Sequence, residues 1–320
     1  MSRRAADVPT LVSQARDGAP RAVARLISLV EDASPLLREV MAELAPYTGH
    51  AHIIGITGSP GVGKSTSTNA LVTAFRKQGK RVGVLAVDPS SPFSGGALLG
   101  DRVRMQDHAL DREVYIRSMA SRGHLGGLSW ATPQALRVLD AAGCDVLLVE
   151  TVGVGQSEVE VVGLADTTIV LLAPGMGDGI QAAKAGILEI GDIFVVNKAD
   201  REGADATVRD IRHMISLGER SDAPQWRPPV LKTVAAQMQG VDEVVAAIGE
   251  HHGWMAEHGE LHRRRVARAA DEIEAITLAT LRARMGDLRG EHSMADLAQQ
   301  VVSGAIDPYA AADRVLANMS

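Results

Sequence analysis

The chain has 320 residues, of which 46% are hydrophobic and 22% are charged, and its formal net charge at neutral pH is −6. This length and composition predict a globular protein with one large α/β domain and helical additions, and they exclude a disordered chain. The acidic net charge argues against a nucleic-acid-binding protein. No apolar run approaches about 18 residues and the N-terminal segment lacks a secretory signal, so we expect a cytoplasmic protein without membrane contact.

The first 50 residues are expected to form a small helical extension. Apolar residues recur at helical spacing between about residues 10 and 45. Breaks in the pattern fall at Gly18-Ala19-Pro20 and at Ser34-Pro35. Several short helices are therefore expected rather than one long helix.

Residues 51–250 show short apolar runs that alternate with helical stretches. Most of these runs are continuously apolar, which is typical of parallel strands buried on both faces. We therefore predict an α/β domain with a mostly parallel, doubly wound sheet. The seven runs expected to be strands are HIIGIT, RVGVLAVD, EVYIRS, DVLLVE, TTIVLLA, DIFVVNK and PPVLKT.

Residues 251–320 contain no further strand pattern and are expected to form a C-terminal helical segment. A long helix is expected from about Trp254 to Met285, ending near Gly286. A second helix has a plausible cap at Ser293, and a third is expected to start at Asp307-Pro308.

The strongest motif is GSPGVGKS, which spans residues 58–65 between an expected strand and an expected helix. It matches the phosphate-binding P-loop pattern, in which glycines let backbone N–H groups face the phosphate oxygens. Lys64 is expected to bridge the β- and γ-phosphates, and the Ser65 hydroxyl is expected to bind Mg²⁺. The residues expected to hold the phosphates are Gly58, Pro60, Gly61, Val62, Gly63, Lys64, Ser65 and Thr66.

A second motif, NKAD, follows the apolar run IFVV and indicates the base of the nucleotide. Asp200 can accept hydrogen bonds from both N1–H and the exocyclic amine of guanine, whereas adenine offers no such pair of donors. Asn197 and Lys198 are expected to take part in the same site, which predicts GTP rather than ATP. The backbone at Val234 and Ala235 is expected to meet the guanine O6, although the serine usual before this alanine is absent.

Four polar residues are candidates for the metal site and for catalysis. Asp88 ends an expected strand, and Asp101 follows a loop rich in Ser, Pro and Gly. Either carboxylate is expected to contact Mg²⁺ directly or through water, and the alternative for Asp101 is a helix cap. Glu150, at the end of DVLLVE, is expected to reach the metal or its water, and its alternative is a polar strand end. Gln156 is a candidate for orienting the attacking water.

Several longer blocks of the chain together resemble the MeaB/ArgK family of GTPases, whose human member is the methylmalonic aciduria type A protein. The resemblance covers nearly the whole chain. The blocks are GSPGVGKST, AVDPSSPFSGGALLGDRVRM, SRGHLGGLS, VETVGVGQSE, LLAPGMGDGIQAAKAGILEIGDIFVVNKAD and DPYAAADRVL.

This resemblance implies a homodimeric GTPase chaperone that assembles with adenosylcobalamin-dependent methylmalonyl-CoA mutase or a related mutase. Such a protein gates cofactor loading and protects the mutase. The resemblance also implies dimerisation through the C-terminal helices and a third mobile loop at about residues 173–184. Within that loop we expect Lys184 to couple the nucleotide state to the mutase.

The alternative functions are a metal-delivery GTPase of a related family and a transport-associated ATPase or kinase. GTPases that deliver nickel or other metals tend to carry a His-rich tract or a Cys-x-Cys-Cys cluster, whereas this chain has a single cysteine. A transport-associated ATPase or kinase would need to recognise adenine, and the NKAD motif argues against that.

Overall fold

The computed structural model describes residues 7–89, 106–108, 110–121, 131–151, 163–175, 190–218, 225–288 and 293–317. The chain divides into two compact units, residues 1–264 and residues 265–320. Asp101, Gln156 and Lys184, for which the sequence predicts functional roles, lie outside the described residues.

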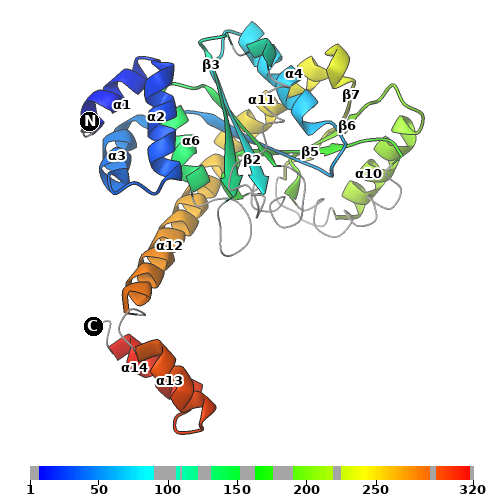
Figure 1. Cartoon of the computed structure of the whole chain (residues 1–320). Coiled ribbons are helices and arrows are strands. Elements are labelled where there is room, and N and C mark those ends of the chain that lie inside the picture. The colour runs from blue at the N-terminus through cyan, green and yellow to red at the C-terminus, as the bar shows by residue number, and fades with distance from the viewer. Residues whose placement is uncertain are drawn as a thin grey trace. The chain divides into compact units, whose positions relative to one another are not determined.

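The first unit is built on a parallel sheet of seven strands in the order β3-β2-β4-β1-β5-β6-β7 (Figure 1). Every neighbouring pair in this sheet is parallel. The sequence-based expectation of a mostly parallel sheet from seven runs is confirmed. The strands are β1 His52–Thr57, β2 Val82–Pro89, β3 Val114–Ser121, β4 Val146–Thr151, β5 Thr167–Leu172, β6 Ile193–Asn197 and β7 Val230–Thr233.

Helices cover both faces of the sheet, because successive strand residues point to opposite sides and both sides are apolar. Leu148 of β4 belongs to a core shared with α4 (Lys64–Lys77) and α11 (Val241–Glu257). Its neighbour Leu147 belongs to a second core, which includes α6 (Ala131–Ala141). A third core joins β5 and β6 to α10 (Ala204–Gly218) and includes Val170 and Phe194.

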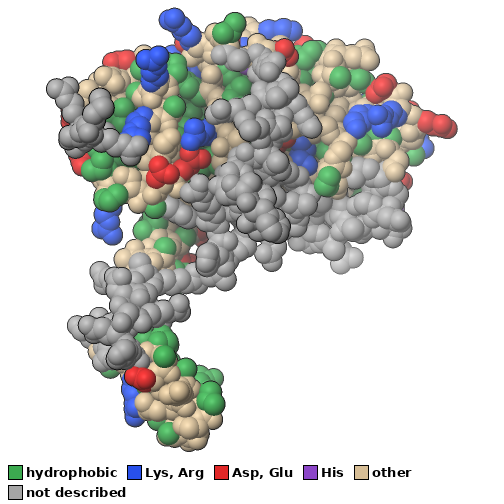
Figure 2. Space-filling view, viewed as in Figure 1, with side chains coloured by type: hydrophobic (Ala, Val, Ile, Leu, Met, Phe, Trp, Pro, Cys, Tyr) green, Lys and Arg blue, Asp and Glu red, His purple; other side chains and the backbone are tan. Residues whose placement is uncertain are grey.

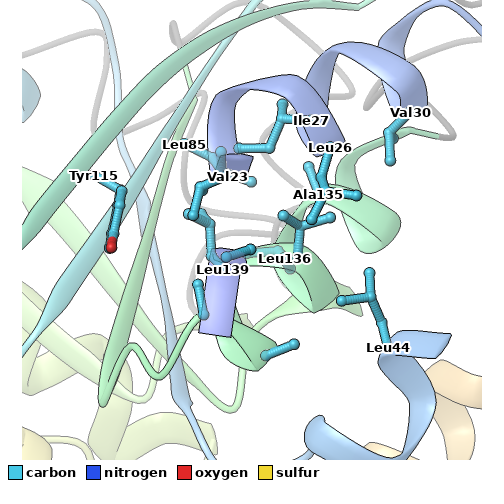
Figure 3. Close-up of a cluster of buried hydrophobic side chains, with 14 of the residues drawn as sticks. Val23, Leu26, Ile27, Val30, Leu44, Leu85, Tyr115, Ala135, Leu136 and Leu139 are labelled. Atoms are coloured by element: carbon cyan, nitrogen blue, oxygen red, sulfur yellow. The ribbon is translucent and has the colours of Figure 1, made fainter. Parts of the chain in front are cut away.

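The N-terminal helices extend the core that lies around α6. They are α1 (Val8–Arg16), α2 (Pro20–Glu31) and α3 (Leu37–Leu44), followed by the short helix η1 (Ala45–Tyr47). The breaks between them fall where the glycine and proline residues predict. Figure 3 shows the side chain of Leu26 on α2 beside those of Ala135 and Leu136 on α6, in the same cluster as Ile27 and Leu85. This extension therefore shares one core with the sheet.

The helix expected from Trp254 to Met285 is in fact divided between two helices. Trp254 belongs to α11, and α12 (Glu260–Leu288) starts after a break at Gly259, where φ is +70°. A positive φ is favourable for glycine and ends the first helix. In the second unit, α13 (Ser293–Val302) and α14 (Pro308–Ala317) begin where the capping residues predict. The Asp307 carboxylate accepts the N–H groups of Tyr309 and Ala310.

On the face seen in Figure 2, Lys and Arg side chains and Asp and Glu side chains both occur on the described surface. Among the helices of the described ranges, none combines the length and the apolar character needed to cross a membrane.

Candidate functional site

The phosphate-binding loop connects β1 to α4, at the carboxyl edge of the sheet where ligands of open α/β folds bind. Two of its glycines have no room for a side chain. Gly58 has φ +141°, and a Cβ there would lie 2.2 Å from the Leu171 carbonyl oxygen. Gly63 has φ +98°, and a Cβ there would lie 2.5 Å from the Asn197 side-chain amide nitrogen. Both positions therefore require glycine, for conformation and for close approach.

Lys64 is the first residue of α4, and its ammonium group is folded back over the loop. It donates to the Gly58 carbonyl at 2.5 Å and to the Ser59 carbonyl at 3.2 Å. The residue is only 7% exposed. The positive charge is thus held within the loop, beside the N-terminus of α4, and both features favour a bound phosphate.

Glu150 and Ser65 are brought together, although 85 residues separate them. The register between β1 and β4 places Ile56 opposite Glu150, so this carboxylate lies beside the start of the phosphate loop. Ser65 donates to Oε1 of Glu150 at 2.6 Å, and Thr68 donates to Oε2 at 2.9 Å. A hydroxyl and a carboxylate beside a phosphate site are hard oxygen donors of the kind that Mg²⁺ prefers.

Thr68 was not among the residues expected at this site. A local signal for it does exist, because Thr68 follows Ser65 by three residues and so shares one face of α4 with it. The partner, however, is Glu150 on β4, and only the folded sheet shows that this carboxylate lies next to α4.

Asn197 connects the base-binding motif to the phosphate loop. Its amide nitrogen donates to the Val62 carbonyl at 2.9 Å. Its amide oxygen accepts from the Thr233 hydroxyl and from the Ala235 N–H, each at 3.1 Å. Asn197 is buried. Its side chain therefore fixes the phosphate loop at Val62 relative to β6 and to the segment at Thr233 and Ala235.

The other residues expected at the base lie around Asn197. Lys198 adopts φ +57° and donates to the Gly61 carbonyl at 2.6 Å, which places its alkyl stem along the phosphate loop. Asp200 is exposed at the same sheet edge. The Val234 N–H donates to the Gln239 carbonyl and the Ala235 N–H donates to Asn197. Contact of this backbone with guanine O6 remains a prediction.

The remaining candidates are only partly described. Asp88 lies near the end of β2, two residues beyond Ala86, and Ala86 pairs with Glu150. Its backbone is therefore at the same edge as the phosphate loop, while its side chain is not described. Asp101 and Gln156, together with residues 176–184 of the expected third loop, lie outside the described ranges. In the loop itself, Pro60, Gly61 and Thr66 are exposed, and Val62 is fully buried.

Comparison with known proteins decides the family. The sequence profile described as "Methylmalonyl Co-A mutase-associated GTPase MeaB" matches residues 23–288. The chain belongs to the MeaB family of GTPases. It is therefore a P-loop GTPase that binds guanine nucleotide and hydrolyses GTP.

Two relatives and one solved structure illustrate this similarity. A putative GTPase of Pyrococcus abyssi is 47% identical over 97% of this chain and 96% of its own length. The mitochondrial methylmalonic aciduria type A homolog of Caenorhabditis elegans is 36% identical over 81% of this chain and 69% of its own. A crystal structure of a LAO/AO transport system kinase has a TM-score of 0.71 and 27% identity, with 100% of this chain and 99% of that chain covered.

Substitution of Asp200 tests the expected base contact of this MeaB-family GTPase. We expect Asp200→Asn to weaken GTP binding by about 2 kcal/mol, because the amide would present a donor to a donor of guanine in place of a charge-assisted bond. The variant should also gain affinity for xanthine nucleotides. Equilibrium titration with fluorescent nucleotides measures both changes.

The neighbouring exposed carboxylate Glu202 provides the control. Glu202→Gln makes the same chemical change two residues away and should leave GTP affinity unchanged. Equal losses in the two variants, or equal affinity of the unmodified chain for ATP and GTP, would refute the assignment of Asp200 to guanine.

Proposed function

We propose that this MeaB-family GTPase assembles with adenosylcobalamin-dependent methylmalonyl-CoA mutase, or with a related mutase, as a chaperone that gates cofactor loading and protects the mutase. The observation that carries the proposal is the match of residues 23–288 to a family described as associated with that mutase. A relative named for methylmalonic aciduria supports it.

The nucleotide site supports a GTP-driven switch that depends on Mg²⁺. Lys64 would hold the phosphates, while Ser65 and Glu150 would hold the metal. Asp88 and Asp101 are the further carboxylates proposed there, and Gln156 is proposed to orient water. When bound, Mg²⁺ would neutralise charge on the phosphate oxygens. Hydrolysis should be slow in the isolated protein, because phosphoryl transfer depends on groups that a partner helps to position.

We also propose a homodimer formed through the C-terminal helices, and exposed apolar residues on α12 support it. Val266, Ile273 and Ile276 are 55%, 66% and 45% exposed. Steps of seven and three residues place them on one face of the helix. Trp254 does not belong to this surface, because it lies on α11 and its ring stacks on that of His258, the residue that caps the end of α11. A monomeric mass by light scattering would contradict the dimer.

The experiment that tests the proposed function combines binding with turnover. The purified GTPase is mixed with methylmalonyl-CoA mutase in the presence of GDP or a non-hydrolysable GTP analogue, and complex formation is measured by size-exclusion chromatography. We expect a complex whose affinity differs between the two nucleotides, and a GTPase rate that rises when the mutase is added. The differential affinity sets the limit of any signal, typically about 1–3 kcal/mol.

Serum albumin at the same concentration is the control for nonspecific effects. The proposal fails if neither nucleotide supports a complex and the mutase leaves the GTPase rate unchanged. A complex with a different adenosylcobalamin-dependent mutase would keep the chaperone role and change the partner.

A further inference from the structure

Thr68 occupies an unusual position on the phosphate-loop helix. It lies one turn after Lys64, it is completely buried, and its hydroxyl is close to two acceptors. The Lys64 carbonyl is 3.0 Å away and Glu150 Oε2 is 2.9 Å away. A hydroxyl has only one proton, so these acceptors compete for it. An ionised carboxylate forms the stronger bond, which favours donation to Glu150.

The consequence for Glu150 is a fixed orientation of its carboxylate. Thr68 donates to Oε2 and Ser65 donates to Oε1, and both donors come from the same face of α4. With both oxygens held, the carboxylate cannot turn about its last side-chain bond without breaking one of these contacts. The oxygen that faces Ser65 therefore remains beside the phosphate loop.

We propose that Thr68 is a positioning residue for the metal site of this GTPase. By holding Oε2, it keeps Oε1 of Glu150 next to the Ser65 hydroxyl. Oε1 and the Ser65 hydroxyl oxygen are then both placed to bind Mg²⁺ or its water. The inference rests on the proposed binding of Mg²⁺ at Ser65 and Glu150. It gives Thr68 no contact with nucleotide.

A purely structural role for Thr68 predicts a different result. Buried threonines in helices commonly donate to the carbonyl four residues earlier, and for Thr68 the Lys64 carbonyl is that alternative acceptor. Loss of that bond alone would alter helix stability and leave the metal dependence of nucleotide binding unchanged. The metal dependence therefore separates the two roles.

The test measures the dissociation rate of N-methylanthraniloyl-GDP from the full chain, over a range of Mg²⁺ concentrations and in excess EDTA. Thr68→Val keeps the shape of the side chain and removes the hydroxyl. We expect it to raise the Mg²⁺ concentration needed for half-maximal slowing of dissociation about tenfold, as for loss of a hydrogen bond to a charged group. The dissociation rate in EDTA should stay within about twofold of the unmodified chain. Thr68→Ser keeps the hydroxyl and should restore the Mg²⁺ dependence.

Thr207→Val is the matched control, because Thr207 is buried on α10 and donates to the carbonyl of Gly203 four residues earlier. It should leave the Mg²⁺ dependence unchanged. If Thr68→Val does not fold, Thr68→Ala removes the same hydroxyl with less bulk and carries the same expectation.

The outcomes separate this inference from the proposed function. Unchanged Mg²⁺ dependence in folded Thr68→Val, while the unmodified chain responds to Mg²⁺, overturns the role of Thr68 alone. An equal change of the rates in EDTA and in Mg²⁺ also overturns it, since the defect would then be general. Absence of any Mg²⁺ response in the unmodified chain overturns the metal site and, with it, the positioning role.

Discussion

Lys64→Ala should lower the rate of GTP hydrolysis at least about 100-fold, because removal of one group that stabilises charge in the transition state typically has an effect of this size. The substitution removes the cation that lies over the phosphate loop and donates to the carbonyls of Gly58 and Ser59. Tight nucleotide binding should weaken at the same time. Single-turnover phosphate release measures the rate, and titration with fluorescent GDP measures the binding.

Lys77→Ala is the control for this experiment, because Lys77 is an exposed lysine in the last turn of the same helix. It should hydrolyse GTP at the normal rate. Circular dichroism should show both variants folded. A folded Lys64→Ala protein with a rate within a few-fold of the unmodified chain would remove Lys64 from the phosphate site.

Asp192→Asn should destabilise the first unit by about 3 kcal/mol, the lower end of the range for breaking a buried ion pair by removal of one partner. Asp192 precedes β6 at the amino edge of the sheet, opposite the nucleotide site. Its two carboxylate oxygens accept from the Arg264 guanidinium, each at 2.9 Å, and one of them also accepts the Thr168 N–H at 2.8 Å. His251 lies 3.3 Å from the same carboxylate. The expected destabilisation lies at the lower end of that range because the Arg264 side chain is about one third exposed.

The effect should depend on pH in a defined direction. Burial raises the pKa of Asp192, but the close approach of His251 and the hydrogen bonds from Arg264 outweigh burial and hold the pKa below its ordinary value. A carboxyl whose pKa is lowered by folding contributes stability above its unfolded pKa, near 3.9, and loses that contribution as the pH falls through the folded value. The stability difference between the two proteins should therefore be complete at pH 7 and shrink below about pH 4.

Urea unfolding followed by circular dichroism at several pH values measures this difference. Asp205→Asn is the control, because Asp205 forms an ion pair with Lys232 at 3.0 Å on the exposed surface. Its unfolding midpoint should remain near that of the unmodified chain, since exposed pairs contribute little. Equal midpoints for Asp192→Asn and the unmodified protein at pH 7 would show that the Arg264 contact does not stabilise the fold.

The sequence by itself determined those features that arise from local patterns. All seven strands fall on the predicted runs, most of which are continuously apolar, because strands covered by helices on both faces need apolar residues at most positions. The phosphate loop was also recognisable, because glycine at positions 58 and 63 is required by positive φ and close contact. The breaks between the N-terminal helices follow in the same way from Gly18 and from Pro20 at the start of α2.

One boundary shows the limit of local patterns. The apolar spacing around Gly259 fits a continuous helix as well as two helices, since a glycine is tolerated within a helix and also ends one. The structure ends α11 before Gly259 and places Trp254 near Trp226, with ring centroids 6.0 Å apart. Trp226 lies 28 residues earlier in the chain, so no local pattern could show this contact.

Only the tertiary structure decided which polar side chains form hydrogen bonds and ion pairs with one another. Thr68 meets Glu150 across 82 residues, and Asn197 joins the phosphate loop to the segment at Ala235. Asp192 meets Arg264 across 72 residues. No sequence periodicity predicts these pairs, because each depends on strand order and register. These bring distant segments together, at the carboxyl edge of the sheet for the first two and at the amino edge for Asp192. A buried polar group then takes whichever partner that edge provides, since remaining unpaired is costly.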